Sequence, residues 1–122
     1  MTMYSYVHLE REFTKPYRSE LNKVKRSEEV ERIFSRTVIN LLSKISNDVN
    51  DSLEEYVKLT PNSSPFYKLE NPLMQIEEVS SAISNSDLPA ILSRLAEDAK
   101  NRYIHLINDD DRSETFKKSP AR

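Results

Sequence analysis

A basic segment near the N-terminus holds the side chains most suited to binding a partner. Six lysines and arginines fall between residues 11 and 26, with one tyrosine among them. The candidate contact residues are Arg11, Lys15, Tyr17, Arg18, Lys23, Lys25 and Arg26. A cationic strip of this kind can neutralise phosphates, and an aromatic ring can stack on a base. A solvated helix face, or pairing with the acidic middle of a second subunit, explains the same pattern.

Neither histidine has the neighbours that metal binding or catalysis requires. His8 shares a helical face with Glu12, which supplies one imidazole and one carboxylate, too few ligands for a metal. The residue three positions before His105 is Arg102, so the Glu-x-x-His pair of di-iron bundles is absent. Carboxylate pairs such as Glu54 and Glu55 are typical of solvated helix ends. We therefore expect no catalytic residue, no metal and no cofactor, and we do not expect an enzyme.

The chain of 122 residues contains no glycine and no cysteine. Phosphate-binding loops, the dinucleotide fingerprint and the nucleophile elbow all require glycine and are therefore excluded. The absence of cysteine excludes disulfides and thiol catalysis. Tight hairpin turns rely on glycine, so a meander of short strands is not expected. Helices must also end without glycine, and we expect left-handed residues such as Asn85 and Asn108 at their ends.

The charges are unevenly distributed, although the net charge is only −2. Residues 1–26 carry six basic and three acidic side chains, whereas residues 27–59 carry four and seven. This separation could orient a partner or a second copy of the chain. No stretch approaches the roughly 20 apolar residues of a membrane span, and the N-terminus lacks the pattern of a secretory signal. We expect a cytoplasmic protein with no membrane partner.

The clearest secondary-structure signal lies between Ser27 and Leu59. Its apolar residues recur every three or four positions, which is a helical period; they are Val30, Phe34, Val38, Leu41, Ile45, Val49, Leu53 and Tyr56. Ser27 suits an N-cap, and acidic residues follow it in the first turn. The spacing predicts one long helix over 27–59. A break within the polar run 47–51 is the alternative.

The remaining segments predict further helices joined by polar loops. We expect a short helix within 2–13, a helical turn from Pro16, a main loop over 60–65, and helices over 72–84 and 88–107. The fold class is therefore all-α, an antiparallel helical bundle of three or four main helices around the long central helix. Residues 1–108 form its single domain, and residues 109–122 a disordered polar tail. The predicted core comprises Val30, Phe34, Val38, Leu41, Ile45, Leu53, Ile76, Ile83, Leu92, Leu95 and Leu106.

The lengths of the predicted helices indicate self-association. A helix over 27–59 would be about 50 Å long, whereas the helix over 88–107 would be about 30 Å long, so the second cannot cover the first. A second copy of the chain would cover the remainder. The favoured function is a non-catalytic protein-interaction or self-association module that uses exposed apolar residues, with a homodimer or another protein as partner. The alternative is a nucleic-acid-associated helical protein that uses the basic strip.

Overall fold

The computed structural model describes residues 5–63 and 65–118 of the chain, with side chains described up to residue 108. The protein is mostly helical with one small sheet, so the prediction of a mainly helical chain is confirmed. The elements are α1 (Val7–Lys23), α2 (Ser27–Ser43), a 3₁₀ helix η1 (Asp51–Tyr56), β1 (Val57–Leu59), β2 (Tyr67–Leu69), α3 (Asn71–Met74), α4 (Glu77–Asn85) and α5 (Leu88–Lys118).

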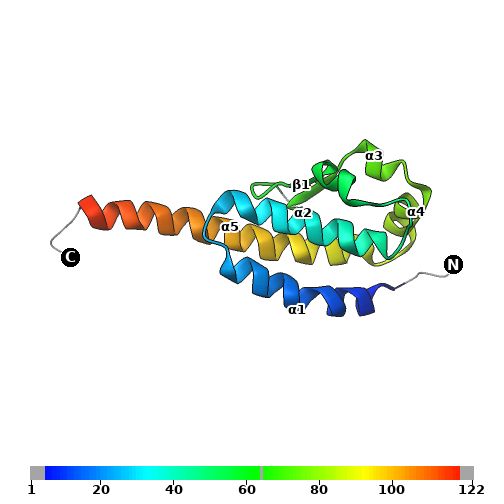
Figure 1. The fold of residues 1–122 in the computed structure, drawn as a ribbon, viewed down its shortest axis with the longest axis horizontal. Coiled ribbons are helices and arrows are strands. Elements are labelled where there is room, and N and C mark those ends of the chain that lie inside the picture. The colour runs from blue at the N-terminus through cyan, green and yellow to red at the C-terminus, as the bar shows by residue number, and fades with distance from the viewer. Residues whose placement is uncertain (1–4, 64, 119–122) are drawn as a thin grey trace.

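Helices α1, α2 and α5 lie side by side, with α1 along one edge of the molecule (Figure 1). Helix η1, strand β1 and helix α3 lie along the opposite edge, beyond α2 (Figure 1). Helix α5 is the longest element and extends past the ends of α1 and α2. The side chains buried between α2 and α5 form the centre of the core; they include Val30, Phe34, Val38, Leu41, Leu88, Ile91, Leu92, Leu95, Ala96 and Ala99.

The predicted single helix over 27–59 is wrong beyond residue 43. Helix α2 ends at Ser43, and Lys44 and Ile45 form tight turns, donating backbone hydrogen bonds to Leu41 and Leu42 at 3.1 and 2.9 Å. The hydroxyl of Ser46 then accepts a bond from the backbone N–H of residue 48. Side chains of this type compete with helical hydrogen bonding, which explains why the break begins where the polar run does.

The apolar spacing continues past this break because residues of other elements fill the same core. Val49 is buried from a turn, and Val57 and Leu59 are buried from strand β1. The 17 residues of α2 match the 17 of α1. The length mismatch that indicated a second copy therefore does not exist for this helix, and that reason for expecting a dimer is withdrawn.

A β-hairpin replaces the end of the predicted helix. Strands β1 and β2 pair antiparallel, with Val57 opposite Leu69 and Leu59 opposite Tyr67. The backbone groups of Val57 and Leu59 on the other edge of β1 bind side chains of α2. Ser35 Oγ donates to the carbonyl of Val57 at 2.8 Å, and Glu31 Oε2 accepts from the N–H of Leu59 at 3.0 Å. Helix α2 thus satisfies an edge that would otherwise be open to pairing.

Three other helices differ from their predicted limits. Helix α1 is continuous from Val7 to Lys23 and contains Pro16 in its interior. The predicted helix over 72–84 is divided into α3 and α4. Helix α5 continues to Lys118, beyond the predicted end at residue 107 and into the segment for which we predicted disorder. Residues 119–122 lie outside the described residues, and the division of the chain at residue 108 stays a prediction.

The predicted core residues all contribute to the observed core. Seven of them are buried, namely Val30, Phe34, Val38, Leu41, Leu92, Leu95 and Leu106. The remaining four, Ile45, Leu53, Ile76 and Ile83, are partly buried and pack against it. The sequence period therefore identified the inward-facing residues correctly even where the local backbone is not helical.

The bond between Ser35 and β1 should be measurable as stability. Replacing Ser35 with Ala leaves the buried carbonyl of Val57 without that donor, so we expect the free energy of unfolding to fall by about 1–3 kcal/mol. Ser43→Ala is the matched control because its hydroxyl bonds an exposed carbonyl, and we expect a loss of less than about 0.5 kcal/mol. Urea denaturation measures both values. Equal losses in the two variants would contradict the role assigned to Ser35.

Candidate functional site

Helices α1 and α5 run in the same direction and are joined by polar contacts along their length. The carboxylate of Asp87, just before α5, accepts bonds from the backbone N–H of Tyr6 at 2.8 Å and from Ser5 Oγ at 2.9 Å. One turn into each helix, Arg94 donates two hydrogen bonds to the carboxylate of Glu10, at 2.6 and 2.8 Å. This bidentate geometry is the strong form of an ion pair and raises the pKa of Arg94.

The contacts continue towards the end of α1. Arg18 Nε donates to Asp98 Oδ2 at 2.9 Å. Further along α5, Arg102 Nη2 donates to the backbone carbonyls of Val24 at 2.9 Å and Asn22 at 3.3 Å. A cation at these carbonyls satisfies orphan acceptors and complements the negative end of the helix dipole. Arg102 therefore acts as the C-terminal cap of α1, although it is far away in the sequence.

Tyr17, which the sequence grouped with the basic residues, belongs to the core. Its side chain is only 1% exposed, and its hydroxyl donates to the carbonyl of Leu95 on α5 at 2.5 Å. Burial, with the neighbouring charge of Asp98, raises the pKa of the Tyr17 hydroxyl well above its ordinary value. Tyr17 is thus not available to stack on a base, and its place in the predicted contact strip is corrected.

The other predicted contact residues are exposed, and most of them remain unpaired. Arg11, Lys15 and Arg18 follow one another at helical spacing along the exposed side of α1. Lys23 lies in the last turn of α1, and Lys25 and Arg26 lie in the connection to α2. Within the described part of the chain, only Arg18 among these six forms an ion pair. We call Arg11, Lys15, Arg18 and Lys23 the basic edge.

An acidic surface, which the sequence reading treated only as solvated helix ends, lies on the opposite side of α2. A shallow pocket of about 280 Å³ between α2, η1 and β1 is lined by four carboxylates and two cations. Its carboxylates, which we call the acidic edge, are Glu28, Glu31, Glu54 and Glu55. The negative balance of residues 27–59 was the available signal. The turn after α2 brings these residues together, because it folds η1 back against that helix.

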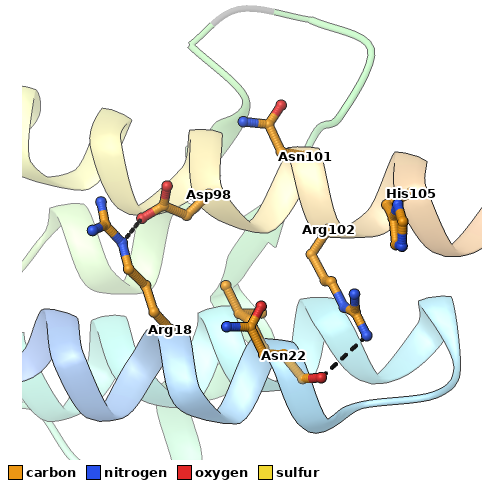
Figure 2. A pocket seen from close by; sticks show the side chains of 7 residues that line it. Arg18, Asn22, Asp98, Asn101, Arg102 and His105 are labelled. Carbon is orange, nitrogen blue, oxygen red and sulfur yellow. Dashed lines mark hydrogen bonds and ion pairs between the residues drawn. The ribbon is translucent and has the colours of Figure 1, made fainter.

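A second pocket, of about 330 Å³, lies between α1 and the middle of α5. Figure 2 shows Arg18 and Asp98 at one end and Arg102 and His105 at the other, with Asn22 between them. Leu21 and Asn101 complete the lining. We call this hollow the α1–α5 pocket. Of its lining residues only Arg18 belonged to the predicted set; Arg102 could be recognised only once α5 was placed against α1.

The described residues show no constellation that would carry chemistry. In that part of the chain no group of three or more His, Cys, Asp or Glu side chains is placed to hold a metal ion. The shifted pKa values there belong to groups in structural contacts, such as Tyr17 and Asp87. None of the described helices has the length and apolar character needed to cross a bilayer.

Comparison of the chain with protein-family models, curated proteins and solved structures found no match. The functional argument therefore rests on the chain's own geometry.

The Asp87 contact makes a prediction about pH. Burial acts to raise the pKa of Asp87, but the bonds from Tyr6 and Ser5 and the charge of Arg94 outweigh it, so the pKa lies below its ordinary value. A carboxylate of this kind stabilises the folded state above its unfolded pKa of about 3.9, and the contribution is lost as the pH falls through the folded pKa. We expect the urea midpoint of the wild type to fall below about pH 4.

Asp87→Asn should remove that component. The variant should be less stable than the wild type at neutral pH, and the gap should narrow as the pH falls. Asp51→Asn is the control, because Asp51 is exposed and its side chain has no hydrogen bond within the described residues. A gap between wild type and Asp87→Asn that stays constant from pH 7 to pH 3 would refute the assignment.

Proposed function

We propose that the protein is a non-catalytic helical module that self-associates through its charged edges. In this proposal α1, α2 and α5 form a three-helix scaffold, and the basic edge of one copy binds the acidic edge of the next. The observation that carries the proposal is the separation of unpaired charge, with cations along α1 and carboxylates beside η1, on opposite sides of the molecule (Figure 1).

The lack of an apolar surface supports an electrostatic contact. Among the described residues, Ile104, at 40% exposure, is the only large hydrophobic side chain that is exposed. Stable interfaces normally bury a core of apolar and aromatic groups. The apolar docking surface expected from the sequence is therefore missing from this part of the chain. Charge complementarity instead governs which surfaces meet and how quickly they meet.

The positions of the two edges define the kind of assembly. Because they are different surfaces on opposite sides, contact between them is heterologous, and the same contact can repeat from copy to copy. The dimer is then the first member of a head-to-tail series. Nucleic acid is the less favoured partner, because the only aromatic residue of the basic strip, Tyr17, is buried.

Reversing charge on one edge should abolish association. Arg11→Glu with Lys15→Glu changes two exposed side chains that have no ion pair within the described residues, so the fold should be retained. We expect the association constant from sedimentation velocity at about 0.02 M salt to fall at least tenfold, which is about 1.4 kcal/mol. The wild-type association should itself weaken strongly at about 0.5 M salt.

Two controls separate specific pairing from a general effect of net charge. Lys44→Glu with Lys68→Glu makes the same change in charge on exposed lysines away from both edges, and association should persist. Glu28→Lys with Glu55→Lys should abolish self-association alone, yet a mixture with the Arg11→Glu, Lys15→Glu variant should associate. A wild type that is monomeric at every salt concentration, or a mixture that stays monomeric, would overturn the proposal.

A further inference from the structure

We propose that the α1–α5 pocket binds the phosphate group of a small organic molecule. This inference is separate from self-association, because it concerns the hollow between two helices of one copy. It rests on the number, placement and fixed orientation of the hydrogen-bond donors that line the pocket.

Arg18 holds donors at one end of the pocket. Its Nε is engaged by Asp98, which orients the guanidinium beside α5 (Figure 2). The two Nη groups have no partner among the described residues. Because a guanidinium offers five N–H donors in a rigid fork, an arginine anchored through Nε still presents up to four donors to an anion. The side chains of Arg18 and Asp98 are 62% and 27% exposed, so a solute can reach this end.

Arg102 supplies the second cation. Its Nη2 is held by the carbonyls of Asn22 and Val24, which fixes the guanidinium against the end of α1. Its Nε is buried and has no partner within the described residues. A buried donor left unsatisfied costs about 1–3 kcal/mol. An anionic oxygen admitted beside it by a small rotation of the side chain would remove that cost, so Arg102 has unused binding capacity inside the fold.

The balance of charge favours an anion even with Asp98 in the wall. Two guanidinium groups face one carboxylate, and His105 lines the same end as Arg102. The amides of Asn22 and Asn101 add neutral donors at the rim. Donors that converge from two helices suit a tetrahedral oxyanion with several acceptor oxygens better than they suit a single carboxylate.

The size of the hollow indicates that the ligand is larger than phosphate alone. A volume of about 330 Å³ lies at the lower end of the range for small-molecule sites, which is roughly 300–1,000 Å³. A water molecule takes about 30 Å³ of the liquid, so inorganic phosphate would leave most of this hollow to solvent. Leu21 offers an apolar surface to the remainder of the molecule. A sugar phosphate fits this combination.

Titration calorimetry with inorganic phosphate and with ribose 5-phosphate tests the assignment. The titrations use the full chain at about 0.15 M salt, where long-range attraction to the basic edge is screened. We expect saturable binding with one site per chain, and tighter binding of ribose 5-phosphate than of inorganic phosphate. No saturable binding of either compound would overturn the proposal, as would equal weak binding that vanishes with salt and indicates only a diffuse ion atmosphere.

Two matched pairs of variants locate the site. Asp98→Asn removes the competing carboxylate and releases Arg18 Nε, so binding should tighten on the order of threefold or more, whereas Glu97→Gln removes the same charge from an exposed position outside the pocket and should leave the affinity unchanged. Arg18→Gln should weaken binding about tenfold, and Arg11→Gln, on the same helix, should not. Both changes in the pocket affect an exposed ion pair, so the fold should survive them.

The pattern across these variants separates the possible outcomes. If each pocket variant behaves like its control, general electrostatics explains the binding and the pocket assignment fails. If a single-stranded oligonucleotide competes and Arg11→Gln weakens it as much as Arg18→Gln does, the ligand is a nucleic-acid backbone along α1, and the small-molecule proposal is wrong. Neither result bears on self-association, which is tested through Arg11 and Lys15 without added phosphate.

Discussion

The close contact between α2 and α5 is the interaction on which the rest of the structure depends. On α5 the two helices meet over Ala96 and Ala99, which are fully buried and small enough to allow a close approach. On α2 the facing residues, such as Phe34 and Val38, are likewise fully buried. The remaining elements attach to this pair. Helix α1 docks through Tyr17 and the polar contacts to α5, and the hairpin docks through its hydrogen bonds to α2. Both charged edges are thus held by one apolar contact.

The absence of glycine shapes the chain differently from what the sequence suggested. Helices α1 and α4 end when Val24 and Ser86 turn to extended backbone, so their ends avoid the left-handed strain that we expected. Among the described residues the only positive φ belongs to Phe66, at 77°, in the hairpin loop. Such a conformation costs a bulky residue about 1–3 kcal/mol. The contact of Lys100 with the Phe66 ring, 4.6 Å from its centroid, offsets part of that cost.

The sequence predicted which residues face inward better than it predicted the path of the backbone. Helical spacing identified Val30 to Leu41 correctly because that segment is a helix with one buried face. After Ser43 the same spacing misled, since residues buried from a turn and from a strand also fall at intervals of three or four. For the candidate site, charge counting found Arg11, Lys15 and Arg18, and the shared face of Tyr17 with Leu21 already pointed to the core. Arg102 could not be found, because its role depends on where the end of α1 docks.

Folding makes the basic edge more positive than the sequence of α1 alone. The helix carries four basic and three acidic residues, a nearly balanced set. Two of those acids attract arginines from other helices, Glu10 binding Arg94 at 2.6 Å and Glu20 approaching Arg36 at 3.7 Å. Asp98 is the single carboxylate that the described residues bring to α1 in return. The docked surface therefore gains more positive than negative charge. A charge count along the chain understates this surface, because ion pairs between helices concentrate the cations along the α1 edge.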